Sequence, residues 1–316
     1  MSVSVVTFKA MKSAVKEAIR RDKYDAVLLF DMGTIRYCPS FCYSKLIVNI
    51  EDPLAIKWHR LVELPIWSFW QRVKLFVLAR LAASYENRIL PKMAKVLLLS
   101  RADVHDMQKQ IGSDNLAFMS YGVDQRNPAE IAGYERRERA IIYSGNMYHP
   151  PNVDGALFLL RDVFPLILQQ YPAAILWIVG SNPDPRIFDA AAKFGKQVQI
   201  TGRVAEVADY IKRATVSICP IRLKIGVQTK VLEALSWGTP VVTTSAGNSG
   251  VGGVSGTHLW VEDEPHLLAQ RVVALLQGRD WTRLSDEGRR LVAENFSWEG
   301  SVAQLERHLE LLAATQ

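Results

Sequence analysis

The 316-residue sequence has few cysteines and histidines, and their spacing excludes several kinds of site. Cys38, Cys42 and Cys219 are too few and too irregularly spaced for a disulfide framework or a zinc site, so we expect a reducing, cytoplasmic compartment. The six histidines are scattered, and no two of them have the spacing of metal ligands. The residues therefore predict no metal site.

Several well-known signatures are also missing. The first residues lack a basic stretch followed by an apolar one, so we expect no signal peptide. No Gly-x-Gly-x-x-Gly follows the first expected strand, which disfavours a hydride-transferring Rossmann enzyme. Neither a Walker lysine loop nor a Gly-x-Ser-x-Gly elbow occurs.

The composition is that of an ordinary globular protein with a core, 49% hydrophobic and 22% charged, and the length favours two domains. The net charge of +6 is unevenly placed: residues 1–125 hold 18 basic and 12 acidic residues, whereas residues 126–316 hold 20 of each. This asymmetry indicates either an anionic partner for the first part or merely a solvated face. No recognition-helix or aromatic-platform motif is present, so we expect no nucleic acid as a partner.

Residues 64–83 are apolar but interrupted by Gln71, Arg72, Lys74 and Arg80, which excludes a membrane span. Trp67, Trp70, Lys74 and Val77 follow helical spacing, with basic residues interleaved. The segment therefore predicts an amphipathic helix, and a peripheral membrane contact is one interpretation. A core helix with inward-facing aromatics is the other.

Short apolar runs alternate with helical stretches along the chain. The runs are continuous, as in parallel strands that are buried on both faces. The pattern predicts an α/β fold with doubly wound parallel sheets. We expect strands at 3–8, 26–31, 46–50, 96–100, 117–121, 140–144, 175–180, 198–201, 216–219 and 240–244, and helices at 152–171 and 229–237. The polar stretch 125–139 predicts a linker.

The segment 219–244 carries the strongest chemical signal. A strand ending at Cys219 is followed by a loop with Gly226 and then by a helix whose N-terminus suits a phosphate. Lys230 lies in the first turn, where a cation opposes the helix dipole, and Glu233 lies on the same face. The alternative is a surface Lys230–Glu233 pair on an ordinary helix. The glycine-rich 247–256 predicts a flexible loop that opens no helix.

This segment resembles the signature of retaining family 4 glycosyltransferases, which have the GT-B fold of two Rossmann-like domains facing a cleft. The matching residues are Gly226, Lys230, Glu233 and the run 238–242, Gly-Thr-Pro-Val-Val. Further motifs follow the family's order at 121–124, 144–152, 178–180, 200–204 and 296–298. The form of residues 144–152 is most similar to that of exopolysaccharide-associated sugar transferases.

The resemblance implies transfer of a sugar from a nucleotide-diphosphate donor, with no cofactor and no required metal. The expected acceptor is a polysaccharide or a glycolipid at the cytoplasmic membrane face. It would therefore be either a saccharide or a lipid-linked molecule. Lys230 and Glu233 are the expected catalytic pair, Lys230 at the diphosphate and Glu233 at the ribose. The expected donor-binding residues are Gly145, Asn146, Arg203, Val204, Arg222, Gly226, Val227, Lys230 and Glu233.

By the same resemblance, residues 1–125 form an acceptor-side domain, 126–295 the nucleotide-sugar domain, and 296–316 a helix that crosses back. The first domain is expected to be incomplete, because it lacks the strand and glycine-rich loop with which family members open. The alternatives are a non-catalytic relic that binds a nucleotide or a partner glycosyltransferase, and a sugar-nucleotide epimerase.

Two of four further residues have both a functional and a structural interpretation. Asp52 contacts the acceptor or caps the helix after Pro53, and His149 contacts the donor or caps the helix that Pro150 begins. We expect Glu86 to be a solvated or interdomain residue of a long helix. Cys219 is expected to be a buried strand end.

Overall fold

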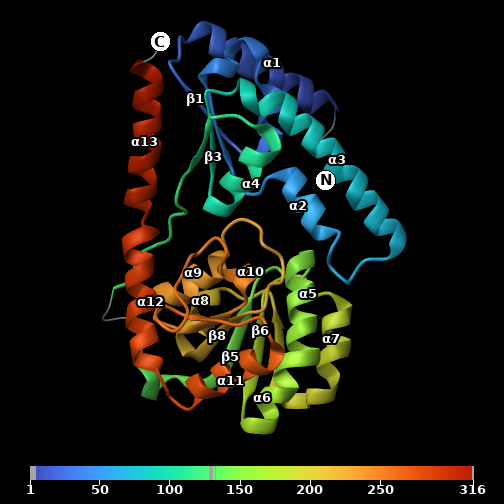
Figure 1. Cartoon of the computed structure of the whole chain (residues 1–316), viewed down its shortest axis with the longest axis vertical. Coiled ribbons are helices and arrows are strands. Elements are labelled where there is room, and N and C mark those ends of the chain that lie inside the picture. The colour runs from blue at the N-terminus through green and yellow to red at the C-terminus, as the bar shows by residue number, and fades with distance from the viewer. Residues whose placement is uncertain (1–4, 128–130, 132, 315–316) are drawn as a thin grey trace. The chain divides into compact units, whose positions relative to one another are not determined.

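The computed structural model describes residues 5–127, 131 and 133–314, which form two units (Figure 1). Unit 1 takes in the chain up to Val62, the segment Phe69–Ser120 and the chain from Glu299. Unit 2 takes in Glu63–Ser68 and Tyr121–Trp298.

Unit 1 is built on a four-stranded parallel sheet whose order follows the sequence, β1-β2-β3-β4. The strands are β1 (Val27–Phe30), β2 (Leu46–Ile50), β3 (Lys95–Leu98) and β4 (Leu116–Phe118). The helical elements are α1 (Val5–Arg21), η1 (Met32–Tyr37), η2 (Ser40–Lys45), α2 (Leu54–Leu61), α3 (Phe69–Ile89), η3 (Leu90–Lys92), α4 (Arg101–Ile111) and α13 (Trp298–Ala314). Every residue of β2 is buried, which explains its unbroken apolar sequence, since both faces of a central parallel strand are covered.

Unit 2 holds a six-stranded parallel sheet in the order β10-β9-β8-β5-β6-β7. Its strands are β5 (Glu138–Ser144), β6 (Ile175–Val179), β7 (Val198–Gly202), β8 (Ala214–Cys219), β9 (Val241–Thr243) and β10 (Trp260–Val261). Its helical elements are η5 (Tyr134–Arg136), α5 (Pro150–Phe158), η6 (Leu159–Val163), α6 (Phe164–Gln170), α7 (Pro185–Ala191), η7 (Ala192–Gln197), α8 (Val207–Arg213), α9 (Thr229–Ser236), α10 (Ser245–Asn248), α11 (Pro265–Leu276) and α12 (Trp281–Asn295). The expected α/β class with parallel sheets is confirmed.

The predicted strand at 3–8 is wrong in its described part, because α1 already begins at Val5. Residues 9–21 are rich in lysine, arginine and alanine, and Val15 and Ile19, four residues apart, pack on the core of unit 1. Helix formation is cooperative, so this stretch extends the helix into the valines before it. Residues 1–4 lie outside the described residues.

Three expectations for unit 2 need correction. The single helix predicted at 152–171 is divided by the π-helical turn η6, where Pro165 lacks the N–H that would bond the carbonyl of Arg161. The glycine-rich 247–256 is not a plain flexible loop, because α10 reaches Asn248 and the Asn248 side chain makes two hydrogen bonds with Gly253. The two-residue strand β10 was not predicted, because it is too short to show a pattern.

The segment predicted as one helix over 64–83 is also corrected. Helix α3 begins only at Phe69, so Trp67 lies outside it. No helix among the described residues is long and apolar enough to cross a bilayer. The exposed and buried faces of α3 are taken up below.

Glu86 is buried, contrary to the expectation of a solvated or interdomain residue. Its Oε1 accepts hydrogen bonds from the backbone N–H of Leu54 (2.7 Å) and Ala55 (3.3 Å), and its Oε2 accepts one from Gln110 (2.9 Å). The carboxylate of α3 therefore caps the first turn of α2, where the residue at the N-cap, Pro53, makes no side-chain bond. Burial raises the pKa of Glu86, and its three hydrogen bonds oppose that rise.

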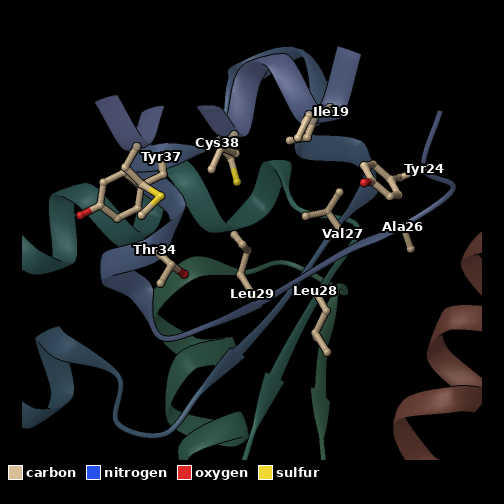
Figure 2. A pocket seen from close by; sticks show the side chains of 12 residues that line it. Ile19, Tyr24, Ala26, Val27, Leu28, Leu29, Thr34, Tyr37 and Cys38 are labelled. Carbon is tan, nitrogen blue, oxygen red and sulfur yellow. The ribbon is translucent and has the colours of Figure 1, made fainter. Parts of the chain in front are cut away.

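An apolar pocket of about 540 Å³ lies beside β1, the edge strand among the described residues of unit 1 (Figure 2). Val27 and Leu29 point toward Ile19 of α1 and Cys38, whereas Leu28 points to the other side of the strand. Phe30, at the end of β1, is 60% exposed. This edge of the sheet thus keeps an uncovered apolar surface, whereas a parallel sheet is normally covered.

We expect Glu86→Ala to destabilise unit 1 by about 2 kcal/mol, because two N–H groups of α2 and the Gln110 amide lose their partner. Glu86→Gln keeps an acceptor and should cost less. Urea unfolding followed by circular dichroism measures both.

The same pair of proteins tests the raised pKa of Glu86. Between the unfolded value and the raised folded pKa, the folded state binds more protons, so stability falls as pH rises. Wild type should therefore lose stability relative to Glu86→Gln as pH increases through this window, with no further change above it. A difference that does not vary with pH would contradict the assignment.

Candidate functional site

The candidate site lies at the carboxyl edge of the unit 2 sheet. Strand β5 ends at Ser144, and neighbouring β8 ends at Cys219, which is buried as expected. Helix α5 follows β5, and helix α9 follows β8 after a loop (Figure 1). The carboxyl edge of a parallel sheet is where ligands bind in open α/β folds.

Lys230 points from the first turn of α9 to the end of β5. Its Nζ donates a hydrogen bond to Oδ1 of Asn152 (2.5 Å) and lies 4.9 Å from the ring centre of Tyr143. Gly145 allows this approach, since a Cβ at that position would stand 3.0 Å from Nζ and 2.8 Å from the Asn152 amide. Gly145 also has a φ of +151°, which disfavours other residues.

Asn152 is held on several sides. Its Nδ2 donates to the carbonyl of Asn146 (2.9 Å), and its backbone carbonyl accepts a hydrogen bond from the Tyr143 hydroxyl (3.1 Å). Its backbone N–H bonds to the carbonyl of His149, the N-cap residue of α5 (2.8 Å). The local sequence, with two prolines at the start of α5, thus fixes the amide that receives Lys230.

Burial lowers the pKa of Lys230, while the nearby Cys219 and Glu233 act in the opposite direction. The ammonium has lost part of its hydration, so an anion that reaches it would interact strongly. The alternative of a surface pair with Glu233 is not found, because no ion pair joins these two described residues.

The start of α9 adds a second feature that suits an anion. Its N-cap residue, Gln228, makes no capping hydrogen bond through its side chain. The preceding turn needs glycines: Gly226 has a φ of +53°, and a Cβ on Gly250 would lie only 2.1 Å from the Gly226 carbonyl oxygen. The glycine-rich segment thus packs directly against the turn at Gly226 and Val227 that leads into α9.

Glu233 lies one turn further along α9, with its side chain exposed. Partial loss of solvation raises the pKa of its carboxyl, while Arg126 and Lys230 oppose this rise. Arg126, 4.4 Å from the ring centre of Trp237, was not predicted from the sequence. It lies in the expected linker, where a single arginine carries no signal.

Arg222 forms a two-pronged ion pair with Asp154 of α5: Nη2 lies 2.6 Å from Oδ1, and Nε lies 2.9 Å from Oδ2. The Asp154 side chain is 1% exposed, whereas that of Arg222 is 39% exposed. A bidentate pair of this kind fixes the plane of the guanidinium. Arg222 was expected among the donor-binding residues, but Asp154 was not predicted as its partner.

The remaining predicted residues belong to three segments of the chain. Arg203, exposed, and Val204 follow β7, three strands from β8 in the sheet order, or roughly 14 Å along the same edge. His149 and Asn146 are both exposed near the start of α5. Asp52 belongs to unit 1, where its carboxylate pairs with Lys57 (2.9 Å). One interpretation of Asp52 was that it caps the helix after Pro53, but the structure shows Glu86 in that capping position.

Two distant motifs of the sequence meet in unit 2. Val123 pairs with Ser297, and the Trp298 indole N–H donates to Asp124 (3.2 Å). A Cβ on Gly122 would lie 2.5 Å from the Trp298 ring, so only glycine fits there without a shift. Helix α13 starts at this junction, and the contacts of its residues from Glu299 onward place them in unit 1.

Comparison with known proteins gives matches of two kinds. Residues 138–278 match the family model for glycosyl transferases, group 1. A protein from Klebsiella pneumoniae, described as an uncharacterized 44.6 kDa protein in the cps region, is 24% identical over 239 residues. That alignment covers 73% of this chain and 56% of the relative.

Solved structures show the fold. Sucrose-phosphate synthase from Thermosynechococcus elongatus superposes with a TM-score of 0.76 at 16% identity, over 98% of this chain and 79% of that one. TarM from Staphylococcus aureus, in a complex with UDP, gives 0.73 at 13% identity, over 96% of this chain and 59% of that one. The fold is therefore GT-B, as expected. The family model matches only residues 138–278, and the chain spans little more than half of the length of the Klebsiella and TarM proteins.

We expect Arg222→Met to destabilise unit 2 by about 2 kcal/mol, because the buried Asp154 carboxylate loses its cation. The exposure of Arg222 moderates the loss, and Met keeps the side-chain stem over Phe158. Adding Asp154→Asn to Arg222→Met should recover part of it in urea unfolding. Simple addition of the two single losses would show that the pair is not coupled.

Proposed function

We propose that this protein is a glycosyltransferase that transfers a sugar from a nucleotide-diphosphate donor bound in unit 2. The observation that carries the proposal is the Lys230 ammonium, which lies partly dehydrated beside Asn152 at the start of α9. A dehydrated cation next to an uncapped helix N-terminus suits the diphosphate of such a donor.

In the proposed reaction, the bond between the anomeric carbon and the phosphate oxygen breaks, and negative charge grows on the departing diphosphate. Lys230 and the N–H groups before and within the first turn of α9, including those at Gly226 and Val227, would stabilise that charge. Because these groups are already in place, little reorganisation is needed during the reaction. Gly145, Asn146 and Arg222 line the same edge of the sheet and would contact the diphosphate and the sugar.

We propose that Glu233 holds the ribose hydroxyls, because it is an accessible carboxylate one turn from Lys230. Arg203 and Val204, further along the same sheet edge, would contact the base. As a family 4-like enzyme, the protein would retain the sugar's configuration. The acceptor oxygen would attack on the face that the phosphate leaves, and a phosphate oxygen would take the acceptor proton. No metal or other cofactor is included in this proposal.

The acceptor is proposed to be a polysaccharide or a glycolipid at the cytoplasmic membrane face, with Asp52 and His149 as weaker candidates for contact with it. The Klebsiella relative is described by its place in a cps region, and TarM was solved with UDP. These descriptions belong to those proteins, and the UDP complex of TarM is in line with the donor class proposed here. The link to exopolysaccharide synthesis rests on the sequence resemblance alone.

A second candidate function is a non-catalytic protein that binds a nucleotide or a partner glycosyltransferase. The apolar pocket beside the edge strand β1 favours it, since an uncovered edge can accept a strand from another chain. Nucleotide binding without transfer to any acceptor, together with a stable complex with another glycosyltransferase, would support this alternative.

Calorimetric titration with UDP and GDP tests the donor site. We expect wild type to bind one of them, and Lys230→Ala to bind it at least about tenfold more weakly, because a charge-assisted contact is lost. Lys196→Ala, at an exposed position on η7, is the matched control and should bind like wild type. A folded wild type that binds neither nucleotide would overturn the proposal.

The pH dependence of that affinity tests the state of Lys230. The protonated form attracts the diphosphate, so affinity should fall as pH rises through the lowered pKa of Lys230. Lys230→Arg stays charged across the pH range. At every pH where this variant binds the nucleotide, its affinity should therefore show no such fall. If the two proteins have parallel pH profiles, Lys230 is not the group that titrates.

A further inference from the structure

One face of α3 carries large apolar side chains that are 40% to 77% exposed. Trp70 is 77% exposed, Phe69 70% and Leu81 63%. The full set is Phe69, Trp70, Val73, Phe76, Val77 and Leu81, which we call the α3 apolar face. Val73, Phe76, Val77 and Leu81 follow Phe69 by four, seven, eight and twelve residues, and Trp70 is next to Phe69. This spacing places all six side chains on one side of the helix.

This face is not the one that holds α3 in the fold. The buried residues of α3 are Leu75, Ala79 and Glu86, which lie on the opposite side of the helix. Glu86 on that side caps α2, so the packing of α3 in unit 1 is already satisfied. The α3 apolar face is therefore additional to the core. Isolated exposed hydrophobic residues are common, but a continuous stripe of this size indicates a binding surface.

The exposed charges on α3 itself are all basic. Arg72, Lys74 and Arg80 are exposed beside or within it. The only acidic residue of α3 is Glu86, which is buried on the other side. The excess of basic over acidic residues in the whole chain also lies in residues 1–125. A partner that complements this surface would have an anionic outer layer for the basic side chains and an apolar layer beneath it for the aromatic ones.

We propose that α3 lies on the surface of an anionic lipid bilayer, with the α3 apolar face in the boundary between headgroups and acyl chains. Trp70 and the phenylalanines would enter this boundary, and Arg72, Lys74 and Arg80 would contact lipid phosphates. Since no described helix is long and apolar enough to span the bilayer, this contact lies along the surface. The inference corrects the sequence interpretation, which began the segment at residue 64 and included Trp67.

The inference deepens the proposed function, because a lipid surface is where a glycolipid acceptor is presented. Its test uses no nucleotide, so the two proposals can fail separately. Calorimetric titration with UDP on the same variants shows whether the donor site is intact. A protein variant that has lost vesicle binding but still binds the nucleotide is folded and is changed only in its membrane contact.

The experiment is co-sedimentation of the full chain with vesicles of phosphatidylcholine alone and of equimolar phosphatidylcholine and phosphatidylglycerol. We expect binding to the anionic vesicles and at least about tenfold weaker binding by the double variant Trp70→Glu, Phe76→Glu. Lys74→Glu should weaken binding in a manner that depends on salt. Phe188→Glu is the matched control, since Phe188 is a 50% exposed aromatic residue of α7, and it should bind like wild type.

A second measurement locates the contact. Lipids with brominated acyl chains should quench wild-type tryptophan fluorescence, and Trp70→Phe should bind equally well but lose most of that quenching. No binding to anionic vesicles, equal binding to both vesicle types, or full binding by the double glutamate variant would each overturn the proposal. Self-association without lipid that the glutamate variant abolishes, with no vesicle binding, would overturn it in favour of a second copy of this chain.

Discussion

The hydrogen bond from Lys230 to Asn152 connects the two strand–helix turns on which the candidate site depends. Lys230 follows β8 and Asn152 follows β5, and these strands are neighbours in the sheet. An ammonium at this depth requires a partner, because burying an unpaired charge is costly. The amide oxygen of Asn152 supplies that partner without neutralising the charge. The cation therefore remains available to an anion, which a carboxylate partner would have opposed.

Several other features of unit 2 make this contact possible. Gly145 leaves space for the ammonium, and Gly250 lets the chain pass close to Gly226 at the turn before α9. The ion pair between Asp154 and Arg222 fixes a second cation beside α5. Each of these residues follows a strand at the same edge of the sheet. The parallel arrangement thus gathers short segments that are far apart along the chain.

Unit 1 shows a different use of charge and apolar surface. The buried carboxylate of Glu86 satisfies the start of α2 from within, whereas the cations of α3 stay in solvent beside exposed aromatics. The exposed apolar side of α3 contributes little free energy to folding, because its side chains remain in contact with solvent. Such a face is retained at a cost in solubility, which is consistent with a surface made for contact.

The sequence by itself determined the α/β class, nearly all of the strands and the place of Lys230 in the first turn of α9. Those features depend on residues that are close together in the sequence, because neighbouring residues determine continuous apolar runs, glycine positions and helix starts. Only the tertiary structure decided that Lys230 bonds Asn152, that Asp154 holds Arg222 and that Glu86 caps α2. These partners are 78, 68 and 32 residues apart, and no local pattern pairs them. The helix at the N-terminus and the outward aromatics of α3 were also decided there, because cooperative helix growth and the choice of buried face depend on what packs against each segment.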